Sequence, residues 1–447
     1  MTLNIENKGK ISIMNYNEAM NYIHEVGNFG SNYGLERTYR ILELLGNPHE
    51  KLKLIHVAGT NGKGSTTAMI TELLKGKGFK VGMYTSPFLE EFEERIQING
   101  ENIPKEALAN LMTRIKVVVD KVIEEGYNHP TEFEIITCLM LFYFKEEKVD
   151  YGVVEVGLGG RLDSTNVITP IISIIASISF DHTNLLGNTL GEIASEKAGI
   201  IKKNVPVVIY PQEKEAYDVI KKKASEMEAP LYEVALDDGK YLGVLNEDRI
   251  YQEVEVNLNN EKFKVKLPLL GEHQIGNMLV ALKAFQVICE KEGYEINIEE
   301  IKNSLSKVKW IGRLEVMKKE PMIVIDGAHN IQGIKALRKN VEKYFKYKNI
   351  YLLLGILADK QVKEMIEEIT PIAKKVYALT PHSNRAELCE DLKNEIIKIN
   401  PNCEAYEDYK KALEQALKEA DKDDLILISG SLYMIGDMRK IIRTREN

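Results

Sequence analysis

The sequence predicts an α/β protein with a large, mostly parallel sheet of the P-loop type flanked by helices, followed by a smaller Rossmann-like α/β unit. Three observations support this fold class. Short apolar runs alternate with amphipathic helical segments, a glycine-rich segment joins one such run to a helix, and the alternation starts again after residue 312. Because 447 residues exceed what one hydrophobic core usually serves, we expect two domains, residues 1–312 and 313–447.

The first domain is expected to alternate strands and helices around the glycine-rich segment. Its apolar strand runs are nearly continuous, which is typical of a sheet covered on both faces. The expected elements are strand 53–58, helix 65–77, strand 81–85, helices 105–125 and 131–146, and strands 150–156 and 171–179.

Between residues 239 and 267 apolar and polar side chains alternate, which predicts a β-hairpin or a small antiparallel element with a polar turn at 259–262. A long helix over 274–291 follows. The second domain then begins with strand 322–325, helix 331–344 and strand 350–354, and it ends with strand 425–429 and a helix from residue 431.

Composition excludes several classes of protein. A net charge of -8 with interleaved acidic and basic residues argues against nucleic acid as an obligatory partner. Residues 1–15 lack the apolar region of a signal peptide, and the greasiest stretch, 167–180, is too short and too interrupted to span a membrane. Four cysteines without a CxxC pair fit a reduced compartment, so we expect a cytoplasmic protein that does not enter a membrane.

A phosphate-binding loop is predicted at 56–67, where a glycine-rich turn follows a strand and opens a helix. Glycines let backbone N–H groups surround phosphate oxygens, the helix N-terminus adds positive potential, and a lysine reaches the terminal phosphates. The blander interpretation is a turn that binds nothing. The residues expected to hold nucleotide are Gly59, Thr60, Asn61, Gly62, Lys63, Gly64, Ser65 and Thr66.

This loop is not a strict Walker A motif, since Gly59 precedes Gly62 by three residues and Gly64 separates Lys63 from the hydroxyl residue. Gly-Thr-Asn-Gly-Lys-Gly-Ser resembles the loop of the Mur ligase superfamily, particularly its branch of folylpolyglutamate and dihydrofolate synthases. Further segments resemble this branch in the same order: 33–37, 85–89, 94–96, 154–166, 181–187, 196–202, 271–277, 312–315, 326–330 and 430–433. Phe88 stands where the family commonly has His, and Ile311 where it often has Pro.

The resemblance implies a ligase that activates a carboxylate with ATP as an acyl phosphate, which the amino group of an amino acid then attacks. The expected substrates are a folate or dihydropteroate, L-glutamate and ATP, and the expected state is a monomer. Phosphoryl transfer depends on charge neutralisation and positioning, so magnesium ions and cations are expected around the γ-phosphate.

The resemblance assigns two magnesium ions to Ser86, Glu155 and His182. Glu155 ends a buried strand, and open α/β sheets bind ligands at the carboxyl ends of their strands. Taken singly, each residue has an ordinary explanation: a turn serine, a helix-capping glutamate and a histidine that only makes hydrogen bonds.

Lys63, His182, Lys197 and His329 are the expected catalytic residues. The family's lysine at the position of Lys197 carries an N-carbamate, an anion that helps to organise the metal site. An unmodified Lys197 would instead pair with phosphate or with Glu155, and a plain surface lysine is the alternative. Asn277, Arg313, Asp326 and His329 are expected to bind nucleotide from both domains, with Arg313 in a hinge that closes around ATP.

The substrate contacts are predicted less specifically. Phe133 either stacks on a pterin ring or packs at the buried start of its helix. Arg161 and Asp163, in the family-like segment 154–166, are further candidates. The cations and hydroxyls for glutamate are expected in the loop 382–385, at His382, Ser383 and Arg385.

Two rival functions differ in testable features. A peptidoglycan-precursor Mur ligase would be expected to carry Gly-Lys-Thr in the loop and a uridine-nucleotide domain before it, but only 58 residues precede Gly59. A nucleotide-dependent regulatory protein that forms no bond would be expected to lack the residues Glu155, His182 and Lys197, and all three are present.

Overall fold

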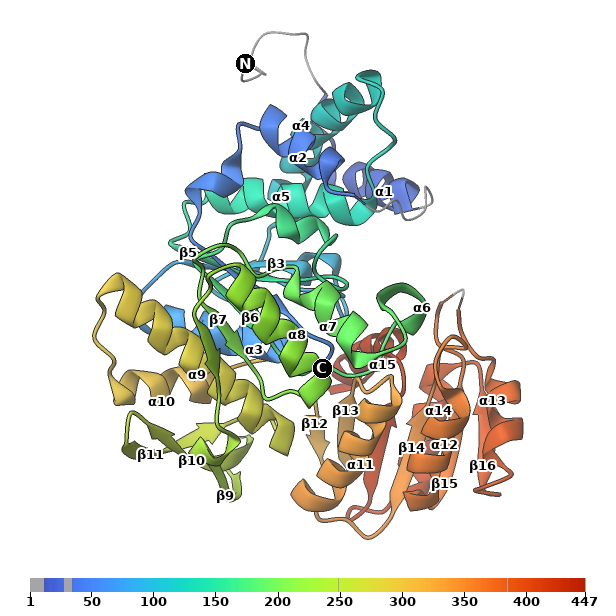
Figure 1. Cartoon of the computed structure of the whole chain (residues 1–447). Coiled ribbons are helices and arrows are strands. Elements are labelled where there is room, and N and C mark those ends of the chain that lie inside the picture. Colours follow the sequence, from blue (N-terminus) through green and yellow to red (C-terminus); the bar gives the residue numbers. More distant parts are fainter. Residues whose placement is uncertain (1–11, 28–33, 248, 384, 447) are drawn as a thin grey trace.

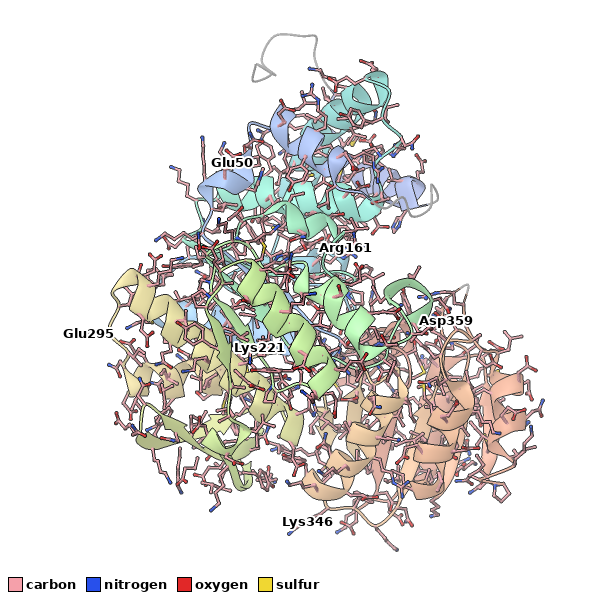
Figure 2. All side chains as sticks on the ribbon, viewed as in Figure 1. Glu50, Arg161, Lys221, Glu295, Lys346 and Asp359 are labelled. Carbon is pink, nitrogen blue, oxygen red and sulfur yellow. The ribbon has the colours of Figure 1, made fainter. Side chains whose placement is uncertain are left out.

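The computed structural model describes residues 12–27, 34–247, 249–383 and 385–446. Tyr33 of the family-like segment 33–37 lies outside these residues. Two large sheets lie side by side with helices around them, and a small third sheet borders both (Figure 1). Side chains fill the spaces between the helices and the sheets (Figure 2). In the part of the chain that the structure describes, every helix is too short or too polar to cross a membrane.

The first large sheet is mostly parallel, as predicted. Its order is β4 (Glu101–Asn102), β3 (Ile96–Ile98), β2 (Val81–Tyr84), β5 (Tyr151–Glu155), β1 (Leu54–Ala58), β6 (Ile172–Ile175), β7 (Val207–Ile209) and β8 (Leu231–Glu233). The six strands β2, β5, β1, β6, β7 and β8 pair in parallel with their neighbours. β3 and β4 add an antiparallel edge beside β2.

Helices cover both faces of this sheet because successive strand residues point to opposite sides. Ile55 and Val57 face the layer of α3 (Lys63–Gly76), α9 (Glu272–Glu292) and α10 (Ile298–Lys307). Leu54 faces the layer of α4 (Lys105–Glu124) and α5 (Glu132–Glu146), to which α1 (Tyr16–Gly27) and α2 (Glu36–Leu44) belong. Beyond them on that side α7 (Leu190–Ala198) and α8 (Lys214–Glu226) cover β6 and β7.

The small antiparallel element predicted over 239–267 is a three-stranded sheet of β9 (Gly239–Asn246), β10 (Ile250–Leu258) and β11 (Glu261–Leu267), of which β9 was not predicted as a separate strand. Asn259 and Asn260 form the turn with positive φ angles of 53° and 65°, a conformation that asparagine tolerates. Val254, Val256 and Val265 bury the inner face of the hairpin against the first core.

The second large sheet is Rossmann-like. Its order is β12 (Glu315–Lys319), β13 (Met322–Asp326), β17 (Leu425–Ser429), β14 (Ile350–Leu354), β15 (Lys375–Leu379) and β16 (Cys403–Tyr406), parallel except for β12. One face packs against α11 (Ile331–Tyr344), α12 (Val362–Ile369) and α13 (Cys389–Ile396). The other packs against α14 (Tyr409–Glu419) and α15 (Leu432–Glu446).

Several boundaries differ from the predictions in ways that matter for the site. β5 ends at Glu155 and β6 at Ile175, although apolar residues continue beyond both. The residues beyond β5, such as Val156 and Leu158, leave the sheet to line a cavity. α3 begins at Lys63 rather than at Ser65, so its N-terminus lies within the glycine-rich loop.

Candidate active site

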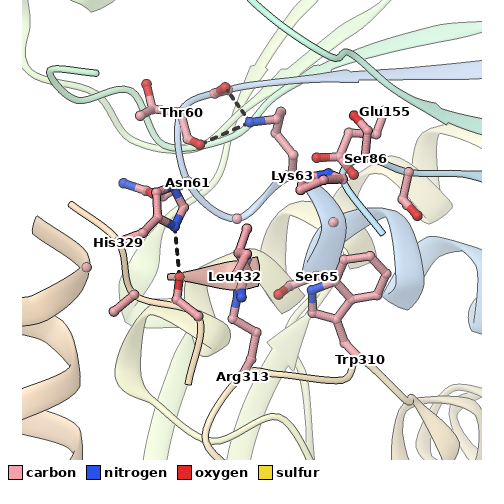
Figure 3. A pocket seen from close by; sticks show the side chains of 18 of the residues that line it. Thr60, Asn61, Lys63, Ser65, Ser86, Glu155, Trp310, Arg313, His329 and Leu432 are labelled. Carbon is pink, nitrogen blue, oxygen red and sulfur yellow. Dashed lines mark hydrogen bonds between the residues drawn. The ribbon is translucent and has the colours of Figure 1, made fainter. Parts of the chain in front are cut away.

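A cavity of about 610 Å³ lies where the strands of the first sheet end, facing the second sheet (Figure 3). The segments that follow β1, β2, β5 and β13 all line it, which is the usual position for ligands in open α/β sheets. Of the predicted site residues, these line the cavity: Gly59, Thr60, Asn61, Gly62, Lys63, Gly64, Ser65, Ser86, Glu155, His182, Lys197, Asn277, Arg313, Asp326, His329 and Arg385.

The glycines of the phosphate loop are required by close contacts. Gly62 has φ +84°, and a Cβ atom there would overlap the Asn277 side chain. A Cβ on Gly64 would overlap the indole ring of Trp310, and a Cβ on Gly59 would lie 2.8 Å from that of Ala176. The loop is also tied to the segment after β6, because the backbone N–H groups of Thr60 and Asn61 donate to the carbonyl oxygen of Ser177, at 2.8 and 3.2 Å.

Two lysines lie at the loop. Lys63 Nζ donates to the carbonyl oxygens of Gly59 and Thr60, both at 3.1 Å, and Figure 3 draws these bonds. Lys197 Nζ donates to the same Gly59 oxygen at 2.8 Å from α7. Lys197 is 3 % exposed, which excludes the surface-lysine alternative. Burial, with the nearby Lys63 charge, lowers the pKa of Lys197 to about 7.

Glu155 presents an unused carboxylate oxygen. Its Oε2 is buried and has no hydrogen-bond partner among the described residues. Burial raises the pKa of Glu155 to about 7, although Lys63 and Arg313 act in the opposite direction. Figure 3 shows Glu155 beside Ser86 at the edge of the cavity. A carboxylate oxygen without a partner next to a hydroxyl fits the oxygen-rich ligation of magnesium.

His182 lines another side of the cavity. It precedes the short helix α6 (Thr183–Leu186) with a left-handed φ of 47°, and burial lowers its pKa. Its neighbour Asp181 forms an ion pair of 3.3 Å with Lys360 from the second sheet's unit. Among the described residues there is no group of three or more Asp, Glu, His or Cys side chains that could hold a metal ion.

The predicted nucleotide residues come from both sides of the cavity. Asn277 Nδ2 donates to Gln274 Oε1 at 3.0 Å, and Gln274 Nε2 donates to Ser65 Oγ at 3.2 Å. Thr66, in contrast, is fully buried in α3 and does not line the cavity, so Ser65 is the hydroxyl that faces it.

On the other side, Asp326 accepts hydrogen bonds from the backbone N–H groups of Leu314 and Ala328, both at 2.9 Å, and so ties the linker to the end of β13. His329 hydrogen-bonds through Nδ1 to the carbonyl oxygen of Gly327 at 2.8 Å. Burial lowers the pKa of His329 to about 4, so its ring is neutral at pH 7. Asn330 caps α11 by accepting from the Gly333 N–H.

Phe133, Arg161 and Asp163 do not line the cavity. Phe133 packs beside Gly157, with its ring 6.1 Å from that of Tyr84. Asp163 is buried and accepts from the backbone N–H groups of Leu158 and Thr165, whereas Arg161 is exposed and pairs with Glu196.

The loop 382–385 divides in the same way. His382 stacks on Tyr409 with ring centroids 4.5 Å apart and hydrogen-bonds to Asp437, away from the cavity. Ser383 Oγ accepts from the backbone N–H of Arg385 and also does not line the cavity. Arg385 lines the cavity and pairs with Asp359 at 2.9 Å.

The lining also contains residues that were not predicted as site residues, among them Gln274, Trp310 and Lys360. Trp310 had a usable indication, since it is the single tryptophan of the chain and precedes the linker. Lys360 had none, because it lies in a loop without any local pattern.

Comparisons with known proteins match both units of the chain. The Mur ligase middle domain matches residues 57–285, and the Mur ligase glutamate ligase domain matches residues 312–432. A dihydrofolate synthase/folylpolyglutamate synthase of Bacillus subtilis is 36% identical over 440 residues, which cover 96% of this chain and 99% of that protein.

Two solved structures are also similar over almost the whole chain. A Mycobacterium tuberculosis folylpolyglutamate synthase complexed with ADP and AMPPCP has a TM-score of 0.86 and 27% identity, over 96% of this chain and 99% of that one. A folylpolyglutamate synthase complexed with AMPPCP and folate has a TM-score of 0.81 and 32% identity, over the same shares of the two chains. The chain therefore belongs to the Mur ligase family, within its branch of folylpolyglutamate and dihydrofolate synthases.

Proposed function

We propose that this chain is an ATP-dependent ligase that adds L-glutamate to folates through an acyl phosphate, and that it also joins dihydropteroate to L-glutamate. The observation that carries the proposal is the cavity in which the phosphate loop, Glu155 and Lys197 from one unit face Asp326 and His329 from the other. The bifunctional name of the Bacillus subtilis relative and the folate complex of a similar structure favour folates over peptidoglycan precursors.

In this proposal the folate carboxylate attacks the γ-phosphate of ATP and displaces ADP. The glutamate amine then attacks the acyl phosphate, and the amide forms as phosphate and a proton leave. The N-terminus of α3 and Lys63 bind the phosphates, and Lys63 exchanges its carbonyl partners for phosphate oxygens. Because residues of both units line the cavity, closure around ATP keeps water from the acyl phosphate.

Glu155 and Ser86 would hold a magnesium ion, and Glu155 with His182 a second one nearby. The unpartnered Oε2 of Glu155 supports this assignment, with water and phosphate oxygens supplying the other ligands. Magnesium would neutralise charge on the phosphate oxygens.

We assign Lys197 an N-carbamate. Its lowered pKa provides the neutral amine that carbon dioxide requires, and the carbamate would replace a cation next to Lys63 with an anion. Arg385, which lines the cavity, would bind a carboxylate of the incoming glutamate.

We also infer a monomer that divides into domains at residue 312 and works in the cytoplasm. The first and second large sheets lie entirely on opposite sides of that residue. The absence of a membrane-spanning helix among the described residues and four unpaired, buried cysteines support the compartment.

The test is ATP turnover by the purified protein with magnesium and L-glutamate, comparing dihydropteroate, tetrahydrofolate and no acceptor. We expect both acceptors to stimulate release of ADP. Stimulation by tetrahydrofolate alone would restrict the activity to polyglutamylation, and stimulation by neither would disprove the folate assignment.

A further inference from the structure

Within the first unit, the carboxylate of one residue, Glu94, holds the loop that carries Ser86. Glu94 accepts hydrogen bonds from the backbone N–H groups of Leu89, Glu90 and Glu91, at 2.7, 3.1 and 3.0 Å. These bonds fix the far end of the loop. Its near end follows β2 and carries Ser86, which lines the cavity beside Glu155 (Figure 3).

The same loop is also held from the other unit, by α15. A Cβ atom on Gly436 would overlap the carbonyl oxygen of Leu89, so the helix and the loop backbone touch. Arg439 Nη1 of α15 donates to Glu90 Oε1, and Arg443 Nη1 donates to Glu90 Oε2 at 3.3 Å. The side chains of Arg439 and Glu90 are 13% and 10% exposed, so this pair is shielded from solvent screening.

Arg439 also reaches the linker. Its Nε and Nη2 donate to Glu315 at 2.8 to 3.0 Å, and Glu315 Oε2 accepts the backbone N–H of Gly312 at 2.8 Å. One guanidinium therefore joins the residue before Arg313 to the loop of Ser86. The fixed fork of arginine suits this bridging of two carboxylates.

We propose that Arg439 is a positioning residue that acts through Glu90 to hold the Ser86 loop against Glu155 when the two units are together. A loop freed from Arg439 would let Ser86 move away from the Glu155 carboxylate. Arg439 lies outside the cavity lining, so the effect reaches the site only through the loop.

The chain offers a matched control for this proposal. Glu272 of α9 also pairs with two cations of the other unit, Lys339 and Lys343, but neither it nor its partners touch the Ser86 loop. Glu90→Gln and Glu272→Gln thus each remove ion pairs between the units, although Glu272, at 42% exposed, is less shielded than Glu90 at 10%. Glu90→Gln leaves the Arg439–Glu315 bonds intact, which separates action through the loop from action through the linker.

The experiment measures amide hydrogen exchange over residues 85–91 in the full chain. We expect exchange to become about tenfold faster in Glu90→Gln, in Arg439→Met and in their double variant alike, with Arg439→Lys closer to wild type. Glu272→Gln should leave this segment unchanged. Unchanged exchange in Glu90→Gln, or an equal increase in Glu272→Gln, would overturn the proposal, as would an effect confined to Arg439→Met.

A second readout follows the metal-binding role that rests on the proposed function. Trp310 contacts the phosphate loop and is the only tryptophan, so its fluorescence reports magnesium titration in the presence of AMPPCP. The magnesium midpoint should rise about tenfold in Glu90→Gln but not in Glu272→Gln. Faster exchange without a shifted midpoint would support the positioning of the loop while contradicting the magnesium assignment at Ser86.

Discussion

Lys63 and Lys197 donate hydrogen bonds to the same carbonyl oxygen, that of Gly59, at 3.1 and 2.8 Å. Two ammonium groups on one oxygen repel each other, and the buried one bears most of the cost because it has lost its water. The proposed carbamate on Lys197 would replace this repulsion with attraction to Lys63. Without the modification, the pair of ammonium groups costs stability.

Replacing Lys197 by methionine should raise stability and remove activity. The free energy of unfolding should rise by about 2 kcal/mol near neutral pH, because a desolvated ammonium is replaced by an apolar side chain. The pKa of Lys197 is about 7 in the folded chain and near 10.5 when unfolded. Between these values the unfolded state binds more protons, so wild-type stability rises with pH and the gain from methionine shrinks.

Urea unfolding of the ligand-free protein at about pH 7 and about pH 9.5 measures this difference between wild type and Lys197→Met. Ligase turnover of the variant should fall at least about a hundredfold. A destabilised variant would contradict the assigned cost of the buried ammonium, and full activity would remove Lys197 from the catalytic residues.

The carbamate on Lys197 is a separate prediction. Carbon dioxide reacts with a neutral amine, and a pKa of about 7 leaves much of the Lys197 amine neutral at pH 8. Carbon-13 NMR of protein kept in labelled bicarbonate should show one carbamate resonance that is stronger at pH 8 than at pH 6. Lys197→Met should lack this resonance. Lys202→Met is the control and should retain it, because Lys202 is a different lysine whose pKa is also lowered by burial.

Magnesium should stabilise the protein in a manner that depends on Glu155. Burial gives this carboxyl a pKa of about 7, and an ion binds the deprotonated form, so binding releases a proton below that pH. The rise in Tm on adding magnesium should therefore be larger at pH 8 than at pH 6. Glu155→Gln should lose both the rise and its pH dependence, as measured by scanning calorimetry.

Glu155→Gln should also change stability without the ion. The folded carboxyl binds more protons than the unfolded one between pH 4.5 and about 7, so wild-type stability falls as pH rises through that range. The metal-free variant should consequently be the more stable protein at pH 8. A variant with a lower Tm than wild type at that pH would show that partners other than a metal stabilise the buried Glu155 carboxylate.

The glycine-rich turn before α3 was predictable because glycine suits the positive φ at Gly62, although the contact that excludes a Cβ at Gly64 comes from the distant Trp310. The burial of Lys197 was not, since its helix carries an ordinary amphipathic pattern and only tertiary packing covers it with Gly59. The third strand β9 was missed for a similar reason. Its side chains alternate between exposed and only half-buried positions, which leaves a weak apolar pattern.

Arg385 and His382 are a second case in which the sequence could not show which residue lines the cavity. Both are cations or potential cations in one loop, yet only Arg385 lines the cavity, while His382 stacks on Tyr409. Arg385→Met should raise the KM for glutamate about tenfold with kcat little changed, because it removes a carboxylate contact. His382→Ala should leave that KM unchanged, and the reverse pattern would move the glutamate site away from the cavity.

The contact between Gly64 and Trp310 gives a spectroscopic prediction. A methyl group on Gly64 would overlap the indole ring, so we expect Gly64→Ala to displace Trp310. Because the chain has one tryptophan, the emission maximum should shift to longer wavelength as the ring gains contact with water. Because Trp310 lines the cavity proposed to bind nucleotide, its displacement should raise the Kd for ATP about tenfold. Thr67→Val on the same helix is the control: its buried hydroxyl lacks a partner among the described residues and does not line the cavity, so neither quantity should change. An unshifted spectrum in folded Gly64→Ala would mean that the loop, rather than the indole, moves to relieve the overlap.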